Sequence, residues 1–141
     1  MFQHWRTYAF ASALFAGLTA ILAKLGVKNI PSNYATLFRT VVVILFLALL
    51  VGVRREWINP LSLNRTSLIF LLLSGIATGL SWLCYFRALQ MGPASLVAPI
   101  DKLSLVFVVV LSVAFLGERL GPAQWAGVFL MSSGAVLIAL K

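Results

Sequence analysis

Charged residues are scarce in this 141-residue chain, since only 10% of them are Asp, Glu, Lys or Arg. Hydrophobic residues make up 62% and mean hydropathy is +1.04, whereas soluble domains are closer to half apolar and a quarter charged. A soluble domain of this size could not bury so much apolar surface. The composition also excludes a disordered chain and a coiled coil, and a single cysteine excludes a disulfide-stapled secreted domain. We therefore expect lipid to be the solvent.

Groups that perform catalysis are rarer still, with three acidic residues and one histidine. The sequence contains no pair of neighbouring carboxylates, no Cys/His cluster, no P-loop and no Gly-x-Ser-x-Gly motif. General acid–base or metal chemistry therefore has almost no groups to use. We predict that the chain is not an enzyme, with no catalytic residue, no metal and no cofactor.

The apolar residues occur in long blocks, each near the length of about 20 residues that crosses roughly 30 Å of hydrocarbon. Runs such as Val41–Leu47 do not alternate as the strands of a membrane β-barrel would, so helices are favoured. A cleaved signal peptide is the alternative for the first block, although no small-x-small site precedes a polar start. The sequence predicts an all-α membrane protein, a single domain over 1–141 that forms a bundle of five transmembrane helices. The predicted spans are about 7–26, 34–53, 67–88, 94–116 and 121–140.

The net charge of +8 and the pI of about 10.7 would indicate nucleic acid in a soluble protein. Here the basic residues are scattered over connections and span ends, which favours anionic lipid headgroups and no nucleic-acid partner. Five spans place the termini on opposite sides, and the basic residues divide almost evenly between the two. Side A carries Arg6, Arg54, Arg55, Arg65 and Arg119, and side B carries Lys24, Lys28, Arg39, Arg87, Lys102 and Lys141.

Orientation follows the Lys/Arg excess on the cytoplasmic side, and five against six is no excess. If Lys24, Arg39, Arg87 and Lys102, which lie within or at the ends of spans, are left out, side A has five basic residues against two on side B. This count predicts that the N-terminus faces the cytoplasm. Otherwise the chain inserts both ways, and an antiparallel homodimer follows as a hypothesis.

Five charged residues lie at the side-B ends of the first four spans: Lys24, Arg39, Arg87, Asp101 and Lys102. Charges inside a bilayer are costly and usually face a bundle interior or a wet cavity, so these five predict a net-positive vestibule. The alternative is that the long Lys and Arg side chains extend to the headgroups.

Asp101 cannot reach the headgroups as easily as a lysine. Pro99 is typical of the first turn of a helix, which would place Asp101 in that turn, where the helix dipole favours a carboxylate. The alternatives are a cation or proton site, or an ion pair with Arg39 or Lys24. On one continuous helix Asp101 and Ser104 share a stripe that Lys102 points away from, which indicates a pathway lining or a helix contact.

The third span combines a polar stripe with aromatic and small residues. Trp82 and Tyr85 fit an aromatic belt at the membrane interface, and a contact with substrate is the alternative for Trp82. Gly75 and Gly79 allow a neighbouring helix to approach closely, as do Gly127 and Gly134 in the last span. These glycines predict packing seams, with the last span as a candidate dimer contact.

Two stretches carry a family resemblance. Residues 82–100 read Trp-Leu-Cys-Tyr-Phe-Arg-Ala-Leu-Gln-Met-Gly-Pro-Ala-Ser-Leu-Val-Ala-Pro-Ile, and residues 115–128 read Phe-Leu-Gly-Glu-Arg-Leu-Gly-Pro-Ala-Gln-Trp-Ala-Gly-Val. With Arg39 early in the second span, this pattern resembles the EamA domain of the drug/metabolite transporter superfamily, in its five-span bacterial and archaeal branch. The Asp101-Lys102 pair departs from most two-domain members. Within these motifs we expect structural turns at Pro93, Pro99, Gly117 and Glu118.

The resemblance implies an exporter of small metabolites or drug-like solutes in the cytoplasmic membrane of a bacterium or archaeon. Two-domain relatives are built from inverted repeats, so a single domain implies a partner of opposite orientation, a homodimer. We expect substrate between the first four spans, with Arg39, Trp82, Tyr85, Asp101 and Ser104 as pathway residues. The alternatives are a non-transporting assembly subunit and a lipid-carrier flippase, whose phosphate headgroup would suit a positive vestibule.

Overall fold

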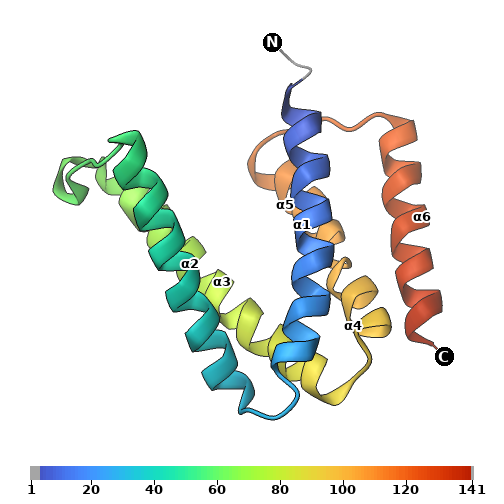
Figure 1. The fold of residues 1–141 in the computed structure, drawn as a ribbon. Helices are drawn as coiled ribbons and strands as arrows, with labels where there is room; N and C mark the ends of the chain where they lie inside the picture. Colours follow the sequence, from blue (N-terminus) through green and yellow to red (C-terminus); the bar gives the residue numbers. More distant parts are fainter. Residues whose placement is uncertain (1–3, 141) are drawn as a thin grey trace. The chain divides into compact units, whose positions relative to one another are not determined.

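The computed structural model describes residues 4–140, and within that range it contains helices and no strand (Figure 1). Lys141, which the sequence assigns to side B, lies outside the described residues. The elements are α1 (His4–Gly26), α2 (Ser32–Arg54), a short 3-10 helix η1 (Pro60–Ser62), α3 (Arg65–Met91), α4 (Ala94–Asp101), α5 (Ser104–Phe115) and α6 (Pro122–Ala139).

Five helical segments of the described chain are long and apolar enough to cross a membrane, which confirms the predicted fold class. Four are the single helices α1, α2, α3 and α6, and the fifth is α4 followed by α5, counted together as Ala94–Phe115. The β-branched runs of α2 stay helical because, in lipid, only a helix or a closed barrel satisfies every backbone group internally.

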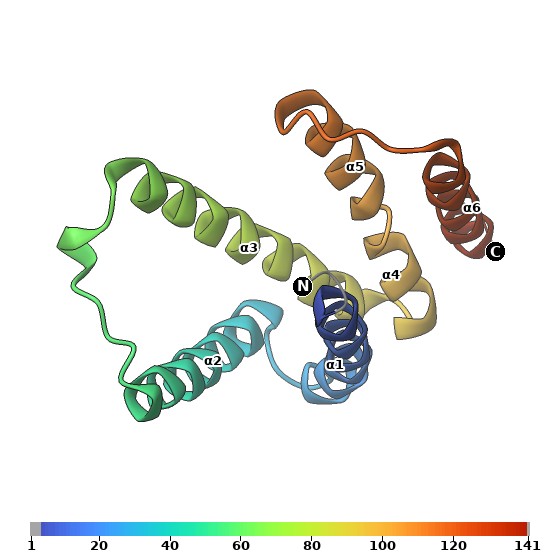
Figure 2. The same ribbon diagram turned by 90° about the horizontal axis from the view of Figure 1, so that it is seen from above.

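The chain divides into two compact units, one up to Met91 and one from Gly92 onward. In the first unit, α2 and α3 pack against each other and α1 packs on α3. Figure 2 shows α2 and α3 closest where α2 begins and α3 ends, and further apart toward the connection 55–64. The buried residues of this unit gather at the close end: Ala20, Ala23, Val27, Ser32, Ala35, Thr36, Phe86 and Leu89.

Helix α2 ends in a regular C-terminal capping motif, although the residue with positive φ is an arginine and not a glycine. Arg55 adopts the left-handed region at φ 54°, with its N–H donating to the Gly52 carbonyl at 3.2 Å. The Glu56 N–H donates to the Val51 carbonyl at 3.0 Å, which completes a Schellman motif. The motif ends the helix at Arg54 and leads the chain into the connection that reaches α3 at Arg65.

In the second unit α6 packs against α4 and α5, and the fourth span is interrupted. Pro93 is the N-cap of α4, while Pro99 lies inside that helix. The prediction that Pro99 occupies a first turn is therefore wrong, since the helix begins five residues earlier, at Ala94. A proline inside a helix removes one backbone donor and favours a break, and α4 ends two residues later, at Asp101 (Figure 2).

The connection between α5 and α6 contains the predicted Gly-Glu-Arg turn. Gly117 has φ +66°, the left-handed region that only glycine adopts at little cost. The Glu118 N–H then donates at 3.3 Å to the Ser112 carbonyl, which also accepts from the Leu116 N–H at 3.0 Å. Gly117 and Glu118 thus form a turn that ends a helix.

Candidate solute-binding site

A cavity of about 350 Å³ lies between α1, α2 and α3, close to the buried end of the first unit. Its lining is almost wholly apolar, and among the described lining residues Arg39 carries the one charge. The main contributors are Thr19, Leu22 and Gly26 from α1, Phe38, Arg39 and Val42 from α2, and Phe86 from α3.

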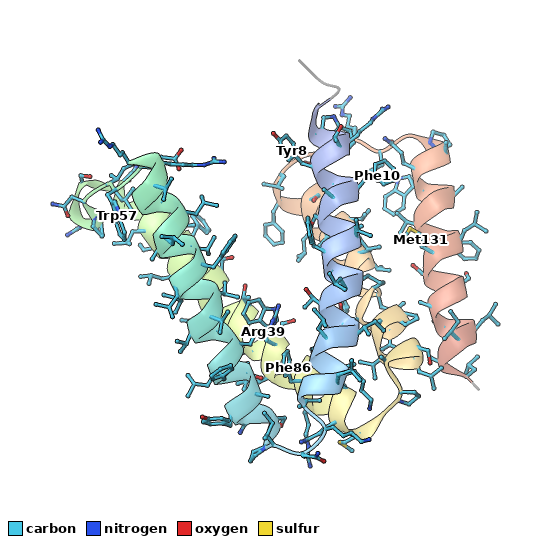
Figure 3. The ribbon with its side chains drawn as sticks, in the orientation of Figure 1. Tyr8, Phe10, Arg39, Trp57, Phe86 and Met131 are labelled. Atoms are coloured by element: carbon cyan, nitrogen blue, oxygen red, sulfur yellow. The ribbon has the colours of Figure 1, made fainter. Side chains whose placement is uncertain are left out.

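The Arg39 guanidinium is held against aromatic rings of α3. Its Cζ lies 4.2 Å from the centroid of the Trp82 ring and 5.5 Å from that of Phe86. Figure 3 shows Arg39 next to Phe86, between α2 and α3. Trp82 and Phe86 are four residues apart on α3, so both rings lie on one face of that helix, turned toward α2. Arg39 and Trp82 are separate predictions from the sequence, and the structure places their side chains in contact.

This cation lies well inside the span. At 1.5 Å per residue, Arg39 is about 10 Å along α2 from its start at Ser32, and Trp82 is about 14 Å before the end of α3 at Met91. Insertion scales assign a central arginine a cost of about 3 kcal/mol, and a cation–π contact offsets about 1–2 kcal/mol of that. The rings therefore compensate only part of the cost of the charge.

The other two residues predicted on α3 have different surroundings. Tyr85 is half-buried, one helical turn from Trp82. Arg87 is exposed, and its guanidinium donates to the Gln90 side-chain oxygen at 3.0 Å. A second hollow, of about 600 Å³, lies beside Arg87 and Gln90 next to the start of α2. The assignment of Tyr85 to the pathway and of Arg87 to a vestibule stays a prediction.

Lys24 has a structural contact that the sequence did not reveal. Its Nζ donates to the Leu89 carbonyl, one of the last four carbonyls of α3, which have no partner within the helix. Nearby, the Gln90 side-chain nitrogen donates to the Ile30 carbonyl at 2.7 Å and to the Val27 carbonyl at 3.4 Å. Lys24 and Gln90 thus join the end of α3 to the turn between α1 and α2.

Replacing Lys24 with methionine should loosen this junction. The apolar stem keeps its packing, but the charged donor to Leu89 is lost, and such hydrogen bonds contribute about 1–3 kcal/mol. We expect a lower thermal midpoint in detergent and faster hydrogen exchange at the end of α3. Lys28→Met, an exposed lysine of the same connection, is the control and should change neither. Equal behaviour of the two variants would contradict the role given to Lys24.

Asp101 occupies a place that the sequence did not predict. It is the last residue of α4 and is followed by a break with i to i−3 hydrogen bonds, from Leu103 to Ile100 and from Leu105 to Lys102, both at 3.0 Å. The helix-start interpretation of Asp101 is therefore wrong. The end of α4 and the start of α5 face each other here, so their dipoles have opposing effects on a carboxylate.

The polar stripe predicted on the fourth span assumed one continuous helix, and that assumption is also wrong. Ser104 is the first residue of α5 and is exposed, so the break separates it from Asp101. Lys102 does not point away from Asp101: its Nζ lies 3.6 Å from the carboxylate. Arg39 and Asp101 belong to different units, and their ion pair stays a prediction, as do the pathway roles of Asp101 and Ser104.

The four glycines assigned to packing seams have open space around them. A Cβ built on Gly75, Gly79, Gly127 or Gly134 meets no atom of the described neighbours within 4 Å. Gly134 lies in a shallow apolar groove between α4 and α6. Contacts of these glycines with a second chain remain a prediction.

Two residues important to the site were missed from the sequence. Phe86 carries no prediction of its own from the sequence, yet it is buried at 3% exposure, with its ring centroid 5.5 Å from the Arg39 Cζ. Gln90 was not singled out, although a polar side chain at the end of an apolar span is a signal for capping neighbouring carbonyls.

The family model of EamA-like transporters matches residues 4–140. The chain belongs to the EamA-like transporter family. It is 49% identical over 140 residues to a Sinorhizobium protein named as an uncharacterized transporter in the cobO 3' region, with 99% of each chain aligned. It is 27% identical over 129 residues to an uncharacterized protein of Methanocaldococcus jannaschii, covering 92% of this chain and 91% of that one. No solved structure matches.

Membership of the EamA-like family confirms the resemblance found in the sequence motifs. Together with the five membrane-length helices, it makes the chain a multi-pass membrane transporter. The Arg39 cavity and the break at Asp101 are two features of this EamA-like chain that place charge within its membrane-length helical segments.

Proposed function

We propose that this EamA-like protein exports small solutes across the cytoplasmic membrane as an antiparallel homodimer. The observation that carries the proposal is the Arg39 cavity, a ligand-sized hollow within membrane-length helices whose single charge is held in place by Trp82 and Phe86. Binding pockets have this character, mostly apolar with a few placed polar groups.

In this proposal the solute binds between α1, α2 and α3, and alternating access exposes the cavity to each side in turn. Asp101, at a break within a membrane span, carries the coupling cation or proton. Discontinuous helices serve this purpose in several transporter folds, because they leave backbone and side-chain oxygens available at membrane depth.

The distribution of basic residues supports the antiparallel arrangement. In the first unit, Arg54, Arg55 and Arg65 lie where α2 ends and α3 begins, while Lys24, Lys28 and Arg87 lie at the opposite ends of these helices. Neither end has the Lys/Arg excess that fixes orientation. Two relatives align over more than nine-tenths of their own length, so this chain matches them nearly from end to end.

Reporter fusions to the C-terminus test this arrangement. We expect comparable activity from a reporter that works only in the cytoplasm and one that works only outside it. The double variant Arg54→Ser, Arg55→Ser should shift the population toward side B in the cytoplasm, because it removes two positive charges from side A. A single orientation in the unmodified chain, insensitive to this variant, would rule out the antiparallel dimer.

A further inference from the structure

We infer that the Arg39 cavity binds small carboxylic acids with an apolar body, a substrate class that rests on the proposed transport function. The inference comes from three properties of the cavity. They are the uncompensated charge of its wall, the geometry in which Arg39 is held, and the size and lining of the space beside it.

The first unit offers Arg39 no acidic partner. In residues 4–91 there is one acidic residue, Glu56, against eight Lys and Arg. Glu56 lies beyond the end of α2 at Arg54, and the intervening helix spans about 22 Å, far more than a side chain can bridge. Arg39 therefore has no carboxylate counter-ion within this unit, and a bound anion would supply one.

The aromatic contacts leave the hydrogen-bonding edge of Arg39 available for that anion. A ring face such as that of Trp82 interacts with the positive charge but accepts no in-plane hydrogen bond. The five N–H donors of a guanidinium lie in its plane, in a fork that matches the two oxygens of a carboxylate. The contacts with Trp82 and Phe86 thus hold the guanidinium without accepting a hydrogen bond from it.

The remaining lining selects the body of the ligand. Leu22, Phe38 and Val42 are apolar, and about 350 Å³ is near the lower limit for ligand pockets. One aromatic ring or a short branched chain fits this space. Solutes with an ammonium group are disfavoured, because their charge and that of the Arg39 guanidinium have the same sign and repel each other.

Tryptophan fluorescence provides a direct binding test of the full-length protein. Trp5→Phe, Trp57→Phe and Trp125→Phe together leave Trp82 as the single tryptophan, in nanodiscs of zwitterionic lipid. The probes are phenylpropionate, phenylpropionamide and phenylpropylamine, which share a ring and differ in charge. We expect saturable quenching by the acid, about tenfold weaker binding of the amide and no binding of the amine.

Arg39 variants then locate the anion. Arg39→Gln should weaken binding of phenylpropionate at least about tenfold and leave the amide unchanged, with Arg39→Lys intermediate because it keeps the charge but loses the fork. Arg54→Gln, on the same helix but outside the cavity, should have no effect. Equal binding of acid and amide, or full acid affinity in Arg39→Gln, would overturn the inference. The comparison of probes on the parent protein decides the question even if Arg39→Gln does not fold.

Three further results separate this inference from neighbouring hypotheses. If anionic phospholipid added to the nanodisc displaces phenylpropionate, the natural anion is a lipid headgroup and the small-acid assignment fails. If proteoliposomes transport amines while acids do not bind, the substrate class fails although the transport function stands. Arg39-dependent acid binding without flux of any solute would support the binding site and refute the proposed transport.

Discussion

Asp101→Asn is expected to abolish solute flux in proteoliposomes while leaving assembly and thermal stability unchanged. The substitution keeps the shape of the side chain and removes the negative charge that the proposed coupling step requires. The structural role of this charge is small, because the pair with Lys102 is half exposed and such pairs contribute only about 0–1 kcal/mol. The helix-start role, which would have made the carboxylate a stabilising group, does not apply to the last residue of α4.

The matched control for Asp101 is Glu118→Gln, which removes another carboxylate from the same unit, at the turn before α6. This variant should transport at the parent rate, since Glu118 contributes its backbone N–H to the turn. Both variants are compared at equal protein density, with dimer content measured by crosslinking. Full flux in Asp101→Asn would exclude Asp101 from the transport cycle.

Trp82→Leu should reduce flux at subsaturating solute by at least about tenfold. Leucine keeps an apolar side chain at this position but has no ring face for the Arg39 guanidinium, whose Cζ is 4.2 Å from the Trp82 centroid. A desolvated cation–π contact contributes about 2 kcal/mol, and each 1.4 kcal/mol corresponds to a factor of ten in affinity. Trp82→Phe restores a ring and should recover most of the loss.

The alternative for Trp82 is an interfacial belt residue, and Trp125→Leu distinguishes the two roles. Trp125 is a half-exposed tryptophan near the start of α6, where a belt position is expected. If Trp125→Leu and Trp82→Leu reduce flux equally, or if Trp82→Phe is as defective as Trp82→Leu, stacking on Arg39 is not the function of Trp82. Stability in detergent is measured for all three variants, so that loss of folding is not counted as loss of transport.

The five spans were predictable because a bilayer imposes a simple rule. Each crossing needs about 20 apolar residues in a helix, and composition alone reveals such blocks. The break in the fourth span was not predictable in the same way. In the sequence, Pro99 indicates the start of a helix. In the structure the helix starts after Pro93, and Pro99 lies inside α4, which ends two residues later at Asp101. A proline in a sequence is compatible with the first turn of a helix and with a break inside one, and only the backbone structure distinguishes the two.

The candidate site was predictable as a list of residues but not as an arrangement. Arg39 and Trp82 were identified because charge and tryptophan within apolar spans are unusual. Their contact depends on how α2 and α3 cross, which no local pattern encodes. For Lys24 the sequence did not reveal the contact at all. Its position at a span end grouped it with the vestibule charges, whereas its Nζ donates to the carbonyl of Leu89, 65 residues away along the chain.

Solute counterflow in proteoliposomes tests directly whether this EamA-like chain alone carries small solutes across a membrane. Liposomes that contain the purified protein and an unlabelled organic acid are diluted into the same acid, radiolabelled. We expect transient accumulation of label, absent from protein-free liposomes and from the Asp101→Asn protein. No exchange of any acid, neutral solute or amine by folded, membrane-inserted protein would contradict it.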